Sequence, residues 1–228
     1  MKRVGGVPIV VLGLLAAIIA WGGSVPGHAQ TGDSNGLGAS VPGPVPVTVD
    51  ARTTALLLLD FVPATCNTDA CLDTVPAAVR LLQKANAAGS LVVFSTIPVP
   101  PPASTPFPQL RTLAPNAPIV AGFPDKFNFP TGTLTPLLGI LTGHNPPIQT
   151  VVITGTCACG AVLYTTFEAN NAGFTTVVAE DTVSADNPFE DRYIKFQLLN
   201  VPVFGNPTNI PLLPDATTLS RGDLITFR

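Results

Sequence analysis

Residues 150–181, TVVITGTCACGAVLYTTFEANNAGFTTVVAED, decide the fold of this chain. They begin with an apolar run, Thr150–Thr154, which is typical of a strand buried on both faces. A tight turn with two glycines follows, and then a helical stretch over Ala161–Ala172 that Gly173 ends. A second apolar run, Thr175–Ala179, completes a strand–helix–strand unit, and a crossover this short predicts two parallel strands in one sheet.

The same alternation continues outward in both directions. Two further buried strands are predicted at Thr54–Leu59 and Leu91–Ser95, and two weaker candidates at Val201–Phe204 and Asp223–Phe227. Helices are predicted at Val75–Ala88, Thr133–Leu141 and Pro188–Leu199, and a proline-rich surface loop at Pro98–Pro118. This order predicts an α/β fold, a three-layer α/β/α sandwich with a mainly parallel sheet.

A functional crevice is expected where the strands end, because ligands of open parallel sheets bind at the carboxyl ends of the strands. The segments at these ends are Asp60, Ser95–Pro98, Gly155–Gly160 and Glu180–Ser184. These segments are candidates for the site before any motif is considered.

The first thirty residues have the pattern of a secretory signal. Basic Lys2 and Arg3 precede an apolar run, Val7–Trp21, and small residues stand at Gly27 and Ala29. We expect cleavage after Ala29, and a secreted or periplasmic protein. An uncut membrane anchor is the alternative, although a spanning helix wants about twenty apolar residues and this run is shorter.

Signal cleavage would leave residues 30–51 as a flexible linker and residues 52–228 as one domain. The remaining chain has nine basic residues against 14 acidic ones, a net charge near −5. This balance argues against nucleic acid and anionic membrane as partners. A small-molecule ligand or substrate is the expected partner, and a homo-oligomer is left open.

Histidine limits the chemistry, because only His144 would remain after cleavage, in the turn-like segment GHNPP. A Ser-His-Asp triad needs a base beside its nucleophile, and zinc sites usually need two or more His or Cys ligands. The chain also has no glycine-rich phosphate-binding motif. We therefore expect no cofactor and no metal.

Residues 52–213 resemble the isochorismatase-like cysteine hydrolases, a superfamily that includes nicotinamidases and N-carbamoyl amidohydrolases. The resemblance is strongest in residues 150–181. The matching positions there are Gly155, Val162, Thr165, Ala169, Gly173, Phe174, Glu180 and Asp181. It implies hydrolysis of a small C–N amide, or of a vinyl ether in one branch, by a cysteine thiolate at the start of the helix. It further implies Asp60 as general base, Lys126 as a charge-supporting group and a cis peptide near Thr156–Cys157.

The chain departs from this family at the nucleophile, since the family cysteine position is Ala161. In one interpretation Cys159 substitutes from a shifted position. In the other, the site is inactive for acyl transfer and the pocket, with Thr156, Cys157, Gly160 and Ala161, binds a ligand without turning it over. A shift of two residues displaces a nucleophile by several ångströms, whereas attack geometry tolerates about one.

The four cysteines suggest disulfides first, because an exported protein meets oxidising conditions. Cys66–Cys71 is the simplest pair, and a Cys157–Cys159 bridge would be strained. Pairs across the two loops, and a zinc site with a poor spacing match, are the alternatives.

The sequence therefore leaves open whether the chain is an enzyme. The leading hypothesis is an exported isochorismatase-like hydrolase, catalytically altered at Ala161, and the alternative is an exported ligand-binding or interaction protein on the same scaffold. A redox role for the CxC segment is a third hypothesis. Phe123, Phe127 and Phe129 are expected in the core or the pocket wall.

Overall fold

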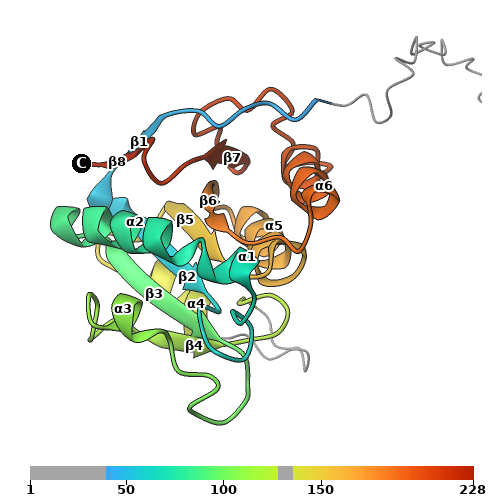
Figure 1. Cartoon of the computed structure of the whole chain (residues 1–228). Coiled ribbons are helices and arrows are strands. Elements are labelled where there is room, and N and C mark those ends of the chain that lie inside the picture. Colours follow the sequence, from blue (N-terminus) through green and yellow to red (C-terminus); the bar gives the residue numbers. More distant parts are fainter. Residues whose placement is uncertain (1–39, 128–135) are drawn as a thin grey trace, which may run out of the picture. The chain divides into compact units, whose positions relative to one another are not determined.

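The computed structural model describes residues 40–127 and 136–228. A parallel sheet of six strands, in the order β4-β3-β2-β5-β6-β7, forms its centre (Figure 1). The strands are β2 (Thr54–Leu59), β3 (Leu91–Thr96), β4 (Ile119–Ala121), β5 (Thr150–Gly155), β6 (Thr175–Val183) and β7 (Thr217–Ser220). The predicted three-layer α/β class with a mainly parallel sheet is confirmed.

Helices cover both faces of this sheet. The helices are α1 (Asp69–Leu72), α2 (Val75–Ala88), α3 (Pro108–Arg111), α4 (Pro136–Thr142), α5 (Leu163–Asn171) and α6 (Pro188–Leu199). Side chains of α1, α2 and α3 pack in one hydrophobic cluster with Leu56 and Leu58. Side chains of α4, α5 and α6 pack in a second cluster with Leu57 and Leu59. Because successive strand residues point to opposite faces, the continuous apolar run of β2 is buried on both sides.

The predicted linker, residues 30–51, overlaps the beginning of the domain. Strand β1 (Val47–Val49) pairs in parallel with β8 (Ile225–Phe227), and the 3-10 turn η1 (Ala51–Thr53) leads into β2. Val47, Val49 and Ala51 are buried, so residues 47–51 are part of the domain and not a linker. The predicted signal segment, residues 1–29, and most of the remaining predicted linker lie outside the described residues.

Two edges of the sheet differ from the sequence-based expectation. Val201–Phe204 is irregular, and the strand beside β6 is β7, whose residues Thr217–Ser220 are mostly polar. Hydrogen bonds explain this placement, since the hydroxyls of Thr176 and Thr217 both donate to the Asn170 side-chain oxygen. Strand β4 is not predicted from the sequence, because it has only three residues and directly follows the proline-rich segment.

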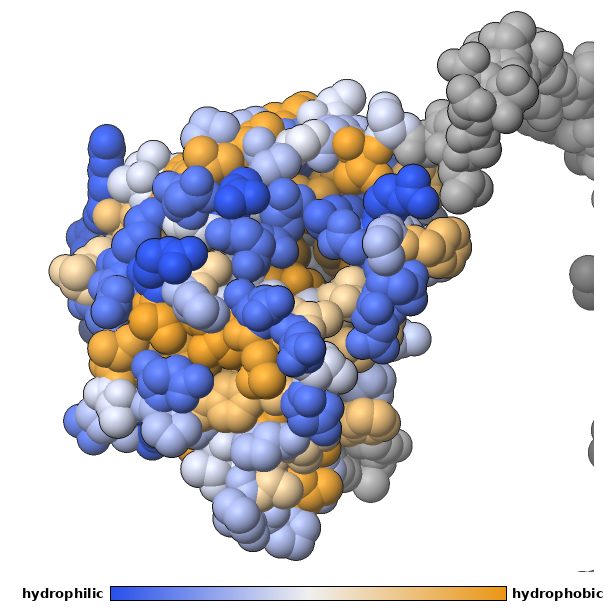
Figure 2. Space-filling view, in the orientation of Figure 1, coloured by the Kyte–Doolittle hydropathy of each residue, from blue (hydrophilic) through white to orange (hydrophobic). Residues whose placement is uncertain are grey.

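Charged residues make up only 11% of the chain, and the surface is correspondingly mixed. Figure 2 shows hydrophobic side chains reaching the surface in several places among hydrophilic ones. Phe189, Tyr193 and Val203 are examples of large apolar side chains that are exposed. Within the described residues, no helix is long and apolar enough to cross a membrane.

Candidate active site

Asp60 stands directly after β2, at the carboxyl end of the central strand. Its backbone has φ 55°, and its side chain is buried. The Asp60 backbone N–H donates to Ser95 Oγ at 3.2 Å, and the Ser95 hydroxyl donates to Asp60 Oδ1 at 2.7 Å. Ser95 lies in the neighbouring strand β3, so two adjacent strand ends hold the carboxylate in one orientation.

Lys126 reaches this carboxylate from the loop after β4. The Lys126 ammonium lies 2.7 Å from Asp60 Oδ2 and donates to the Gly122 carbonyl oxygen, also at 2.7 Å. Its backbone N–H donates to Thr165 Oγ1 of α5 at 3.2 Å. A Cβ at Gly122 would lie 2.6 Å from the Asp125 carbonyl oxygen, so the loop folds back tightly only with glycine there.

Burial dominates the electrostatics of this ion pair. Desolvation raises the pKa of the Asp60 carboxyl above its usual range, while the Lys126 charge and the hydrogen bonds to Lys126 and Ser95 oppose the rise. Desolvation likewise lowers the pKa of the Lys126 ammonium, against the attraction of Asp60. Both shifts favour the neutral form of each group, because a buried charge loses its hydration. Asp60 is thus suited to accept and release a proton within the site.

The turn after β5 meets the end of β2. Leu59 is in register with Gly155, and the Thr156 N–H donates to the Leu59 carbonyl oxygen at 3.1 Å. Gly155 has φ 130°, and a Cβ there would overlap the backbone of Leu59. The Thr156–Cys157 peptide is cis, as the resemblance implied.

Ser184, just past the end of β6, holds this turn from its other side. The Ser184 hydroxyl donates to Thr156 Oγ1 at 2.7 Å, and the Ser184 carbonyl accepts from the Ala158 N–H at 2.8 Å. The Ser184 N–H donates to the Gly155 carbonyl at 3.2 Å. The path of residues 155–158 is therefore set by two neighbouring strands. In the sequence, Ser184 is indicated only by its place in the segment Glu180–Ser184 at a strand end.

Ala161 lies in the π-helical turn η2 (Ala158–Val162) that leads into α5. Its methyl group is buried in the same hydrophobic cluster as Leu59 and Phe127. The position thus has the burial of a site residue but no group that can attack a carbonyl. We expect the side chains of Asp60 and Lys126 to lie within about 8 Å of the Ala161 Cβ, because a catalytic site needs its groups that close together.

Glu180 and Asp181, the acidic pair after the fourth predicted strand, contact other parts of the chain. Glu180 forms an ion pair with Lys195 of α6 at 3.1 Å. Asp181 Oδ1 accepts from the Gly222 N–H at 2.6 Å. These contacts tie β6 to its neighbours, and they give this pair a structural role.

The cysteines divide into a bonded and an unbonded pair. Cys66 and Cys71 form a disulfide across α1, which confirms the simplest predicted pairing. Cys157 and Cys159 are not disulfide-bonded, and their Sγ atoms lie 3.2 Å apart. Partial burial and the neighbouring Cys157 and Glu190 raise the pKa of Cys159 to about 12. Within the part of the chain that the structure describes, no group of three or more His, Cys, Asp and Glu side chains could hold a metal ion.

The three phenylalanines differ in environment. Phe127 is buried, and its ring lies 6.1 Å from that of Phe174 between ring centroids. Phe123 is 55% exposed, so its predicted place in the core is wrong, and its place in a pocket wall stays a prediction. Phe129 lies outside the described residues.

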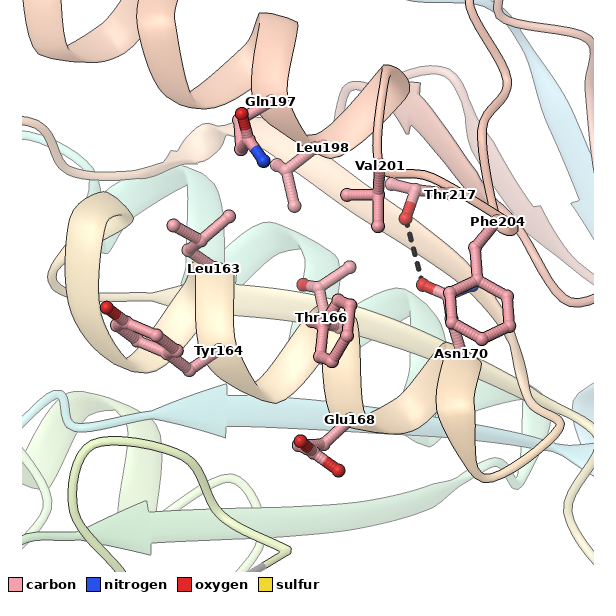
Figure 3. A pocket seen from close by; sticks show the side chains of 11 residues that line it. Leu163, Tyr164, Thr166, Glu168, Asn170, Gln197, Leu198, Val201, Phe204 and Thr217 are labelled. Atoms are coloured by element: carbon pink, nitrogen blue, oxygen red, sulfur yellow. Dashed lines mark hydrogen bonds between the residues drawn. The ribbon is translucent and has the colours of Figure 1, made fainter. Parts of the chain in front are cut away.

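A separate pocket of about 390 Å³ lies between α5 and α6 (Figure 3). Leu163, Phe167 and Leu198 line it, whereas Asp60, Lys126 and Ala161 do not. At one end the Thr217 hydroxyl donates to Asn170 Oδ1 at 3.0 Å. Its walls are mainly apolar, with Glu168 as a charged lining residue, and the Asp60–Lys126 pair lies outside it.

Known proteins agree with this architecture. The family model of the isochorismatase domain matches residues 54–209. N-carbamoylsarcosine amidase from Thermoplasma acidophilum is 21% identical with a TM-score of 0.57, over 75% of this chain and 97% of that one. A cysteine hydrolase from Pseudomonas syringae pv. phaseolicola is 15% identical with a TM-score of 0.63, over 81% and 95%.

The nicotinamidase from Staphylococcus aureus is 20% identical with a TM-score of 0.56, over 65% of this chain and 94% of that one. Among curated proteins, no relative matches the chain. The structural neighbours show the fold, and the family model shows the membership. The chain belongs to the isochorismatase family.

Proposed function

We propose that this chain is an exported isochorismatase-family protein whose site takes a small C–N amide or a related substrate. We further propose that cysteine-dependent hydrolysis is impaired at Ala161. The observation that carries the proposal is the intact, buried Asp60–Lys126 pair beside a turn whose nucleophile position is a methyl group. Two structural neighbours are named as a carbamoylsarcosine amidase and a nicotinamidase, and both act on amide substrates.

Asp60 and Lys126 supply acid–base chemistry in this proposal. A carboxyl whose pKa is raised by burial can take a proton from an attacking group and return it to a leaving amine. The Lys126 ammonium, 2.7 Å away, stabilises the carboxylate form that is present before the first transfer and again after the second. Neither group replaces the nucleophile, because the proposed chemistry begins with attack on the carbonyl carbon.

Cys159 is a poor substitute for the missing nucleophile in amide hydrolysis, and this supports the proposal. Its side chain is exposed, and a thiol with a pKa of about 12 is almost wholly protonated near neutral pH. The thiolate is the attacking form of cysteine, so this sulfur lacks the activation that a catalytic cysteine needs.

The second candidate is a non-catalytic ligand-binding protein, and Ala161 itself favours it. A methyl group removes the reactive atom but leaves the charged pair that would orient an amide. The two candidates differ in one respect. An impaired hydrolase regains turnover when the sulfur returns, whereas a rebuilt binding pocket does not.

The test is Ala161→Cys, with Ala161→Ser as the matched control. We measure ammonia release from nicotinamide, N-carbamoyl compounds and simple aliphatic amides, with reductant present. Ala161→Cys should exceed wild type by about a hundredfold, because positioned acid–base groups contribute at least that much once a nucleophile is present. Ala161→Ser should stay near the wild-type rate, since a hydroxyl beside Asp60 has no thiolate character.

Cys159→Ser completes the design. We expect it to leave the low wild-type rate unchanged. Wild-type turnover that disappears in Cys159→Ser would make Cys159 the nucleophile and overturn the proposal. If Ala161→Cys gains nothing while an amide still raises the Tm of wild type, the binding-protein candidate holds instead.

Export is proposed from the first thirty residues, with cleavage after Ala29. The intact mass of the secreted protein should correspond to a chain that begins at Gln30. A mass equal to the full 228 residues would show an uncut anchor.

A further inference from the structure

The turn after β5 holds two unbonded thiols in contact. Cys157 and Cys159 have their Sγ atoms 3.2 Å apart, while Cys66 and Cys71 of the same chain are disulfide-bonded. We propose that Cys157 and Cys159 are a redox couple that reduces disulfide compounds by thiol–disulfide exchange, with Cys159 as the attacking thiol and Cys157 as the resolving one. This activity is independent of the amide chemistry proposed above.

The geometry needs only a small movement to close the bond. A disulfide has an S–S distance of about 2.05 Å, so the two sulfurs must approach by roughly 1.1 Å. Gly160 leaves the necessary room, because a Cβ there would lie 2.9 Å from Cys157 Sγ. Between the thiols, buried Ala158 is fixed by its N–H bond to the Ser184 carbonyl.

The exposure of the two sulfurs assigns their order. Cys159 is exposed, and Cys157 is half-buried behind it. An external disulfide therefore meets Cys159 first, and the sulfur of Cys157 is already in contact with the mixed disulfide that forms. This order of exposure assigns Cys159 as the attacking thiol and Cys157 as the resolving one, and the raised pKa of Cys159 makes the attack slow at neutral pH and faster as the pH rises.

Glu190 of α6 supplies a proton acceptor. Its Oε2 accepts from the Asp186 N–H at 3.3 Å, whereas its buried Oε1 accepts no hydrogen bond among the described residues. This carboxyl group is close enough to Cys159 to contribute to the raised pKa of that thiol.

The reaction balances with oxidised glutathione as the co-reactant. The Cys159 thiol loses its proton to Glu190, and its sulfur attacks one glutathione sulfur. The glutathione S–S bond breaks, a mixed disulfide forms, and the first glutathione leaves as a thiolate that takes up the proton. The Cys157 sulfur then attacks Cys159 Sγ and displaces the second glutathione, which takes the Cys157 proton. Two electrons pass from the protein dithiol to the glutathione disulfide.

The test equilibrates the full exported chain in glutathione buffers, followed by alkylation and mass mapping. We expect a single two-electron transition assigned to the 157–159 peptide. The midpoint of this transition measures how far strain in a bridge across one residue offsets the raised pKa of Cys159. Cys157→Ser should trap a mixed glutathione disulfide on Cys159, and Cys159→Ser should slow the reaction at least about tenfold, since only the half-buried thiol remains.

Glu190→Gln separates a redox role from a structural one, with Glu168→Gln of α5 as the control that removes a charge elsewhere. Glu190→Gln should shift the midpoint toward easier reduction, because loss of the carboxylate lowers the pKa of Cys159. Glu168→Gln should leave the midpoint in place. A wild-type protein that stops at the mixed disulfide, or keeps two alkylatable thiols in oxidised glutathione, would overturn the proposal. An identical midpoint in wild type and Glu190→Gln would remove Glu190 from it.

Discussion

The site has two halves that differ in what they retain. Asp60 and Lys126 form a fully built ion pair, held by Ser95 and by the Gly122 carbonyl. The turn at residues 156–161 has a cis Thr156–Cys157 peptide, and it carries a methyl group at Ala161 and two thiols nearby. The ion pair and the turn are therefore held in place by different contacts.

This difference has a physical basis. The ion pair is buried between a strand end and a loop, so loss of one partner leaves a charge without compensation. A side chain at position 161 needs only to fit, because the turn is held by backbone bonds from Leu59 and Ser184. The Asp60–Lys126 pair is thus tied to stability, whereas the side chain at position 161 is constrained mainly by the space around it.

The largest expected effect is on the ion-pair half. Lys126→Met should lower the free energy of unfolding by about 3–5 kcal/mol, because Asp60 then stays buried without its partner. The double variant Asp60→Asn/Lys126→Met should recover most of this loss, to within about 1–2 kcal/mol of wild type, since no charge is then buried. Urea denaturation at neutral pH measures the free energy of unfolding of both variants and of wild type.

Lys195→Met is the control for that comparison. Lys195 also pairs with carboxylates, Glu180 and Asp191, but its side chain is 24% exposed, so we expect a loss of about 1 kcal/mol or less. Equal losses of unfolding free energy in Lys126→Met and Lys195→Met would show that burial does not make the Asp60–Lys126 pair more important for stability than a partly exposed ion pair.

The next effect tests the turn half. Gly155→Ala should cost about 3 kcal/mol, since a Cβ at φ 130° is strained and overlaps Leu59. Gly139→Ala in α4 has open space around its Cβ and should stabilise the protein by about 0.5–1 kcal/mol. Thermal unfolding of both variants tests the contrast. A neutral Gly155→Ala would mean that the turn accepts another backbone path.

The smallest effect concerns the protonation of Asp60. Its folded-state pKa lies above the ordinary 3.8, so the folded protein binds this proton more tightly than the unfolded chain does. The contribution of Asp60 to the free energy of unfolding therefore falls as the pH rises from 3.8 through the folded-state pKa. Carbon NMR of labelled aspartate should show one carboxyl that titrates above 3.8 and is missing in Asp60→Asn. Titration below 3.8 would mean that Lys126 outweighs desolvation.

The sequence by itself determined the features that depend on local pattern. The apolar runs and the glycine after each helix predicted β2, β3, β5, β6, α2 and α5. Asp60 was found because it ends an apolar run, and Cys66–Cys71 because two cysteines five residues apart lie in one loop. These signals arise from residues that are close together in the sequence, so they can be recognised without knowing the fold.

Only the tertiary structure decided the contacts between distant segments. The Lys126–Asp60 pair spans 66 residues, and the Ser95–Asp60 bond spans 35. Strand β7 can be polar because Asn170 and Thr176 form hydrogen bonds with its Thr217 hydroxyl. Strand β1 has the sequence pattern of a linker because its partner strand, β8, lies at the other end of the chain. The 3.2 Å contact of Cys157 and Cys159 depends on Ser184, which holds the turn between them. Composition and periodicity record which residues prefer burial, whereas pairing is set by whichever groups the fold brings within hydrogen-bond distance.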